Sequence, residues 1–252
     1  MPPISLVIIT QNAAASLSAC VHSARALVDE VVVVDSGSND GTPMLAQSLG
    51  ARVIAQDWLG FGPQKRFAVA AARHDWVLCL DADEQLTPKL AAAIQAELAE
   101  PCHHAYRLAR RNRFMGRYLR HGEGYPDWCL RLFDRRHANW SEDLVHEAVQ
   151  TQTTVGTLNG DLLHDSAEDL ASYLDKQNRY TSLQAAELAS RGKTAGLARL
   201  VLSPLARFFK FYLVRRGFLD GLPGLVHICI GCFNGFIKYA KLRELSRQKG
   251  QV

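Results

Sequence analysis

Residues 30–42 read EVVVVDSGSNDGT, and this stretch decides the fold class. Its run of valines is typical of a strand that is buried on both faces of a sheet. The Ser-, Gly- and Asp-rich segment that follows predicts a tight turn, and Thr42–Leu49 has the spacing of a helix. A continuous apolar strand that leads through a turn into a helix favours a parallel sheet covered by helices.

The same alternation extends over the first hundred residues. Strands are expected over Ile4–Thr10, Glu30–Asp35, Arg52–Ala55 and Trp76–Leu80. Helices are expected over Ala13–Leu27, Thr42–Leu49, Phe61–Arg73 and Lys89–Ala99. After Pro101 we expect strands over Tyr106–Arg113, Trp128–Phe133 and Leu158–His164, a loop over Arg110–Tyr125 and a helix that begins near Ser141. The pattern predicts an α/β fold with a single, mostly parallel sheet.

Composition and charge suggest two parts. The chain has 252 residues, 48% of them apolar, which suffices for one α/β domain with an appendage. Residues 190–252 carry 12 Lys and Arg against 2 Asp and Glu, a net of +10, so the remaining residues carry −6 of the total of +4. We therefore predict a domain over residues 1–165 and a helical, basic, amphipathic extension over residues 166–252, whose charge favours an anionic partner.

Acidic and hydroxyl side chains follow the predicted strands at their carboxyl ends, where open parallel sheets bind ligands. Asp81 and Asp83 come directly after the apolar run WVLCL at residues 76–80. Two carboxylates at this spacing can both reach a hard cation, so Mg²⁺ or Mn²⁺ is the expected cofactor, bridging them to a diphosphate. The alternative is a solvated acidic turn, which is common on protein surfaces.

The turn after the valine strand offers acceptors for a nucleoside. Asp35 can accept a hydrogen bond from a ribose hydroxyl and Asp40 from a base N–H, although an ordinary Asx turn that caps the next helix explains the same residues. The sequence contains neither GxGxxG nor GxxxxGK[ST], which disfavours dinucleotide redox chemistry and P-loop phosphoryl transfer. Phosphates would then be held by the metal and by side chains such as Lys65 and Arg66.

The ordered segments VVVVDSGSNDGT, GFGPQKRFAVAAA and LCLDADEQL, which follow VIIT-x-N, resemble the inverting nucleotide-sugar glycosyltransferases of family 2. The segments LARRNRFMGRYLRHGEGYPDWCLRLFDR and SEDLVHEAV resemble the lipopolysaccharide inner-core β-1,4-glucosyltransferases of Gram-negative bacteria. The resemblance implies a GT-A-like fold. It also implies transfer of a hexose, glucose from UDP-glucose, to a heptose of the inner core. A polyprenyl-phosphate or other envelope glycan acceptor remains an alternative.

The resemblance also implies roles for individual residues. Asp35 and Asp40 would bind the nucleoside with Asn12 nearby, and Asp81 would face the ribose or sugar of the donor. Asp83 would bind the metal, and the metal shell could include Asp81 and His164. Glu142, Asp143 and Glu147 are candidates for the base that deprotonates the acceptor hydroxyl, and Asp143 is favoured because family members carry a Glu-Asp pair there. For His164, a hydrogen-bonded structural histidine is the alternative.

Acceptor binding is expected from the Arg- and Tyr-rich loop and from two residues beyond it. Guanidinium groups bind phosphates bidentately, and lipopolysaccharide core carries phosphates and acidic sugars. The candidates are Arg113, Arg117, Arg120, Tyr125, Arg131 and His146. A solvated basic face is the alternative for the loop, and a structural histidine is the alternative for His146.

The basic extension suggests a membrane surface as partner. Leu197–Val214 is apolar with interspersed cations, and Gly221–Ile237 lacks formal charge but contains Pro223, Asn234 and glycines. We expect interfacial amphipathic helices rather than a spanning helix, and hence a cytoplasmic enzyme that is peripheral on the inner face of the cytoplasmic membrane. A packing layer or a homo-oligomer interface is the alternative. A non-catalytic nucleotide- or nucleic-acid-binding protein is the competing class, but the extension is too apolar for a nucleic-acid face.

Overall fold

The computed structural model describes residues 1–143, 147–166 and 169–248, and the chain divides into two compact units. The first unit comprises Met1–Arg110 and Asp127–Asp165, and the second comprises Arg111–Pro126 and Ser166–Val252. The predicted ranges, 1–165 and 166–252, assigned Arg111–Pro126 to the first domain, whereas the structure groups it with the C-terminal helices.

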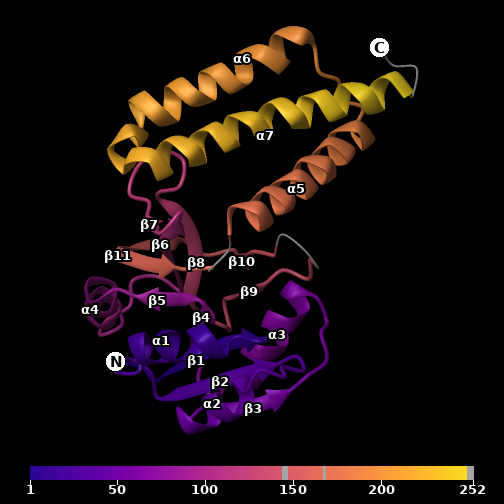
Figure 1. Ribbon diagram of the computed structural model, residues 1–252. Coiled ribbons are helices and arrows are strands. Elements are labelled where there is room, and N and C mark those ends of the chain that lie inside the picture. Colours follow the sequence, from indigo (N-terminus) through magenta and orange to yellow (C-terminus); the bar gives the residue numbers. More distant parts are fainter. Residues whose placement is uncertain (144–146, 167–168, 249–252) are drawn as a thin grey trace. The chain divides into compact units, whose positions relative to one another are not determined.

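The first unit is built on one sheet with the strand order β3-β2-β1-β4-β8-β6-β11-β5 (Figure 1). Its parallel part consists of β1 (Ile4–Thr10), β2 (Glu30–Asp35), β3 (Arg52–Ala55) and β4 (Trp76–Asp81). Its antiparallel part consists of β5 (Glu84–Leu86), β6 (Ala105–Phe114), β8 (Asp127–Asp134) and β11 (Val155–His164). The α/β class and the parallel sheet of the first hundred residues are confirmed.

Helices cover both faces of this sheet. They are α1 (Ala14–Ala24), α2 (Thr42–Ser48), α3 (Phe61–Ala71) and α4 (Pro88–Glu97). Because side chains alternate along a strand, β1 turns Leu6 and Ile8 into a core shared with α1 and α4, and Val7 into a second core shared with α3. Burial on both faces explains why these strands read as unbroken apolar runs.

Strand register determines where the candidate site lies. In the parallel ladder Thr10 is paired with Asp35, and Ile9 is paired with Asp81. Three strands therefore end at the same edge, and the polar residues that follow each of them converge there, as the sequence predicts.

The helix expected near Ser141 does not form within the described residues. Instead β9 (Ala138–Trp140) pairs in antiparallel register with β10 (Val149–Thr151), and the backbone N–H of Ser141 donates to the carbonyl of Ala148 at 2.8 Å. Trp140 is buried in the core beneath α3, which holds the chain extended there. Residues 144–146 lie outside the described part of the chain.

The second unit is mainly helical. It contains the short strand β7 (Arg117–Tyr118), α5 (Leu170–Ser190), α6 (Leu197–Phe208), the π-helical turn η1 (Phe209–Val214), the 3₁₀ turn η2 (Gly217–Asp220) and α7 (Gly221–Gln248). Both α5 and α6 pack along α7 (Figure 1). Among the described residues, Gly217–Arg247 is long and apolar enough to cross a membrane by length and composition alone, whereas the sequence pattern predicts interfacial helices in this region.

A buried carboxylate fixes the loop of the second unit. Asp220 accepts hydrogen bonds from the backbone N–H groups of Arg120 and His121 at 2.9 and 2.7 Å. The His121 ring lies 3.2 Å from the same carboxylate. The Arg-rich segment is therefore anchored on η2 and is not a free loop.

Candidate active site

Asp81, at the end of β4, is held between two cations. Its Oδ1 lies 3.0 Å from Lys65 Nζ, and Arg131 Nη2 donates to its Oδ2 at 2.6 Å. Burial raises the pKa of the Asp81 carboxyl, but the attraction of Arg131 and Lys65 outweighs burial and holds that pKa well below its usual range. Asp81 is thus a fixed anion at neutral pH.

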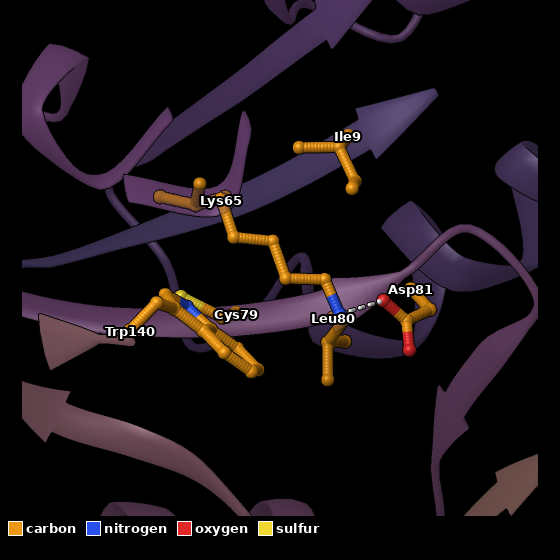
Figure 2. Close-up of a pocket in the computed structure, with 7 residues that line it drawn as sticks. Ile9, Lys65, Cys79, Leu80, Asp81 and Trp140 are labelled. Carbon is orange, nitrogen blue, oxygen red and sulfur yellow. Dashed lines mark ion pairs between the residues drawn. The ribbon is translucent and has the colours of Figure 1, made fainter. Parts of the chain in front are cut away.

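Lys65 reaches this carboxylate from α3. Figure 2 shows its side chain extending from the helix toward Asp81, in a small pocket that Trp140 also lines. The ammonium lies 4.4 Å from the centre of the Trp140 ring and donates to Glu147 Oε1 at 2.9 Å. Lys65 therefore bridges Asp81 and Glu147, one of the candidate bases.

Arg131, predicted to bind the acceptor, is buried on β8. Besides Asp81, its guanidinium donates to both oxygens of Glu84, at 3.1 and 2.8 Å. Burial lowers the pKa of Arg131, but the two carboxylates outweigh it and raise that pKa above its usual range. Glu84 is itself buried, takes a further hydrogen bond from Arg110 and accepts the backbone N–H of Asp81. This geometry fits a residue that positions Asp81, and the acceptor role remains a prediction.

Asp83 immediately precedes β5, His164 is the last residue of β11, and the two side chains face each other. His164 Nε2 lies 3.3 Å from Asp83 Oδ2, and their side chains are 22% and 29% exposed. The backbone N–H of Asp165 donates to the carbonyl of Asp83 at 3.0 Å, which holds the two segments together. Carboxylate and imidazole are both ligands of divalent metals, so this pair suits the metal role that the sequence suggests for it.

Asp35 and Asp40 order the turn after β2. Asp35 accepts hydrogen bonds from the hydroxyls of Thr10 and Ser38, at 2.8 and 2.5 Å. Asp40 accepts hydrogen bonds from the backbone N–H and the hydroxyl of Thr42 and from the backbone N–H of the first residue of α1. The hydrogen bond from the Thr42 hydroxyl is the main cause of the lowered pKa of Asp40. Asn12 accepts the backbone N–H of Asn39 at 2.9 Å. The Asx turn of the alternative interpretation is therefore present, and the binding of a nucleoside by Asp35 and Asp40 remains a prediction.

The favoured base lies against the start of α3. The backbone N–H of Gly62 donates to the carbonyl of Asp143 at 3.1 Å, and a Cβ at Gly62 would lie 2.4 Å from the carbonyl oxygens of Ser141 and Asp143. Asp143 itself is exposed, and Arg66 Nη2 lies 3.7 Å from the exposed Glu142. Glycine at position 62 therefore allows the close approach that sets the Asp143 segment.

The remaining acceptor candidates divide between the units. Arg113, Arg117, Arg120 and Tyr125 belong to the second unit, whereas Arg131 belongs to the first. Arg117 donates to the carbonyl of Leu219 at 3.2 Å, and Arg120 is exposed. His146 lies outside the described residues.

Two residues that hold the site in place are not predicted from the sequence. Glu84 follows the acidic pair directly, but only the fold shows that it is buried against Arg131. Gln64 is fully buried, where its amide donates to the Ser36 hydroxyl at 2.9 Å and so ties α3 to the turn after β2. The sequence signal that could have identified Gln64 was the fully polar Gln-Lys-Arg run at the start of this helix.

Comparison with known proteins identifies the family of the chain that carries this site. The model of the family described as glycosyl transferase family 2 matches residues 5–154, which include every one of the three strand ends. The chain belongs to glycosyl transferase family 2.

Relatives of this family 2 glycosyltransferase match almost all of its length. An uncharacterized glycosyltransferase of Rickettsia bellii is 34% identical, over 97% of this chain and 87% of the relative. The lipopolysaccharide core biosynthesis glycosyltransferase LpsC of Rhizobium meliloti is 30% identical, over 96% of this chain and 92% of the relative. Glucosyl-3-phosphoglycerate synthase from Mycobacterium tuberculosis, solved with Mn²⁺, UDP-glucose and phosphoglyceric acid, is 27% identical over 44% of each chain with a TM-score of 0.39.

Proposed function

We propose that this family 2 enzyme is an inverting, metal-dependent hexosyltransferase that moves glucose from UDP-glucose to a heptose of the lipopolysaccharide inner core. The observation that carries the proposal is the convergence of Asp35, Asp81 and Asp83 at one sheet edge beside the cation Lys65. The similarity to LpsC, a protein named for lipopolysaccharide core biosynthesis, supports the choice of acceptor.

Asp83 and His164 are the residues that would hold Mg²⁺ or Mn²⁺. Both side chains are partly open to solvent and lie 3.3 Å apart, so a cation can reach them. Asp81 fits a ligand role less well, because Lys65 and Arg131 already neutralise both of its oxygens. A bound divalent ion would supply positive charge for the diphosphate that leaves.

The chain's own residues carry the remaining steps. Asp143 would take the proton of the acceptor hydroxyl, since inversion needs a carboxylate on the side of the sugar opposite the leaving diphosphate. Lys65 and Arg66, on the first turns of α3, would attract the diphosphate, and Asp35 and Asp40 would hold the nucleoside. Glu147 is less suited as the base because Lys65 binds it at 2.9 Å.

The acceptor would meet the Arg-rich segment of the second unit. Arg113, Arg117, Arg120 and Tyr125 offer guanidinium groups for phosphates and an aromatic ring for a sugar face. Since η2 anchors this segment through Asp220, these side chains are presented from a fixed backbone.

The second unit would bind a membrane surface. Along α6 and η1, Leu197, Val201, Leu205, Phe209 and Leu213 are spaced four residues apart and all are exposed, so they form one apolar stripe. On the other side of α6, Arg207 pairs with Glu123, and Arg199 lies 5.3 Å from the Tyr239 ring of α7. The apolar face thus points away from the unit's own core, which is the arrangement of an interfacial helix.

The net charge of +10 over residues 190–252 would favour the anionic lipid of an inner membrane face. We therefore propose a peripheral protein on the cytoplasmic side of the membrane, where it would meet a lipid-linked acceptor. A spanning orientation of residues 217–247, which their length permits, would be detected as resistance to extraction by alkaline carbonate.

The test is donor binding and hydrolysis by the purified full chain, across UDP-, GDP-, ADP- and CMP-sugars with and without Mn²⁺ or Mg²⁺. We expect a metal-dependent preference for UDP-glucose. In Asp83→Ala, turnover should fall at least about 100-fold with the fold intact, as expected for lost charge stabilisation. Unchanged turnover in Asp83→Ala would overturn the metal assignment, and failure to bind any nucleotide sugar would favour the non-catalytic class.

Acceptor identity needs a second assay. Lipopolysaccharide truncated to its inner-core heptoses should accept radiolabelled glucose, whereas polyprenyl phosphate should not. Transfer to polyprenyl phosphate alone would replace the proposed acceptor while leaving the donor and the chemistry in place.

A further inference from the structure

A group of side chains that could hold a metal ion lies at the other end of β4 from Asp81. β8 runs antiparallel to β4, and Trp76, the first residue of β4, is paired with Asp134, the last residue of β8. Asp134, His104 and His137 each offer a ligand atom, and these atoms all lie within 4.8 Å of one another. None of the three takes part in the proposed transfer reaction.

The backbone holds these three residues in place. The N–H of Asp134 donates to the carbonyl of His104 at 2.8 Å, and the N–H of His137 donates to the carbonyl of Asp134 at 2.9 Å. The two imidazole rings are stacked, with centroids 3.9 Å apart and an interplanar angle of 27°. His104 precedes β6, Asp134 ends β8 and His137 precedes β9, so the cluster joins three segments by short local contacts.

Burial and exposure in the cluster suit a ligand set. Asp134 is buried, whereas both histidines are exposed, so a cation can approach from solvent and meet a carboxylate that is already in position. Arg136 binds both oxygens of Asp134, through Nε at 2.9 Å and Nη2 at 2.6 Å, but its side chain is 60% exposed and its Nη1 lies 3.2 Å from Asp75. Arg136 can therefore yield an oxygen of Asp134 to a metal and keep an ionic partner.

We propose that His104, Asp134 and His137 form a binding site for a borderline transition metal, for which Zn²⁺ is the best match. Two imidazoles and one carboxylate are typical zinc ligands, with water in the fourth position. The Asp83–His164 pair has one imidazole and one carboxylate and lies at the opposite end of β4. Bound metal would cross-link the ends of β6 and β8 to the turn before β9, and so stabilise the first unit.

The experiment is Zn²⁺ titration of the chelator-treated full chain by calorimetry, with Co²⁺ as the spectroscopic probe. The wild type should bind one Zn²⁺ at this site and unfold at a temperature a few degrees higher, as a ligand specific to the folded state requires. His104→Gln and His137→Gln should each weaken binding at least about tenfold, since even loss of an outer-shell partner costs that much. Both side chains are exposed, so these variants should fold.

The matched control is His103→Gln. His103 neighbours the cluster in sequence, but its ring bonds the Thr154 hydroxyl at 2.9 Å, so zinc affinity should be unchanged. Asp83→Ala should also retain this zinc site, which separates it from the proposed catalytic metal. Equal affinity in wild type, His104→Gln and His137→Gln would overturn the proposal. So would a thiolate-to-cobalt absorption band that Cys102→Ser abolishes, because the metal would then be bound by cysteine.

Discussion

The two units place apolar and charged side chains in opposite ways. In the first unit the apolar residues are buried between sheet and helices, and charged residues such as Arg131 and Glu84 are buried with them as partners. In the second unit no residue of α6 is buried, and leucine, valine and phenylalanine side chains form its outer face.

This difference suggests different roles for the two units. Burying a charge costs free energy unless the charge is paired. The network around Asp81 therefore carries a desolvation cost that a purely apolar core does not have. Exposed apolar stripes are equally unfavourable in water, and they mark surfaces that contact another phase or molecule. We therefore propose that the first unit carries the catalytic residues and that the second unit binds another phase or molecule.

The largest expected effect is that of removing the carboxylate that we propose as the base. Asp143→Ala should lower the rate of transfer by about 10²–10⁴-fold, because general base catalysis contributes that much. UDP-glucose binding should be unchanged, since Asp143 would act on the acceptor. Single-turnover rates with a saturating donor provide the measurement. Glu142→Gln is the matched control at an exposed neighbour, and a greater loss in this variant than in Asp143→Ala would transfer the base role to Glu142.

The next effect tests the buried charges of the first unit. Arg131→Met should destabilise that unit by about 3–5 kcal/mol, because it removes the buried cation that Asp81 and Glu84 share and leaves them with Lys65 and Arg110 as partners. Arg107→Gln, at an exposed position on the neighbouring strand, should stay within about 0.5 kcal/mol of wild type. Urea unfolding followed by tryptophan fluorescence measures both. Equal stability of the two variants would show that the network is not needed for folding.

Much of the first unit is predictable from sequence because its signals are local. Apolar runs such as VVVV at residues 31–34 and the turn residues after them specify parallel strands and strand ends. The antiparallel strands past residue 100 show weaker patterns. The local sequence near Ser141 predicts a helix, because the pairing of Ser141 with Ala148 joins residues that a local pattern does not connect.

The candidate site was predictable by residue type but not by partner. Asp81 and Asp83 carry equal signals in sequence, yet the fold gives Asp81 two cations and Asp83 a histidine. Arg131 illustrates the same limit. The sequence offers Arg131 as an acceptor-binding guanidinium, while its burial depends on Glu84, a contact that spans strands far apart in sequence.

A smaller effect on rate tests how the first unit positions Asp143, the proposed base. Gly62→Ala should lower transfer by about 100-fold, because a methyl group 2.4 Å from the Asp143 carbonyl must push that segment away, and displacements near 1 Å cost this much. Donor affinity and the melting temperature report whether the fold survives. Gly235→Ala is the control, since nothing lies within 4 Å of its Cβ. Full activity in Gly62→Ala would mean that the Asp143 segment need not stay where α3 holds it.

The smallest effect concerns the surface of the second unit. The double variant Val201→Glu/Leu205→Glu should weaken binding to vesicles of anionic lipid at least about tenfold, because each side chain loses on the order of 1 kcal/mol of transfer free energy and each new carboxylate is repelled. Urea stability should not change, since both side chains are exposed in the folded unit. Met44→Glu, at an exposed apolar position of the first unit, should bind vesicles as wild type does. The contrary outcome is a double variant that still binds vesicles but sediments as a monomer where the wild type sediments as a larger species. The stripe would then join copies of the chain, and the contrast between the units would reflect assembly and not membrane binding.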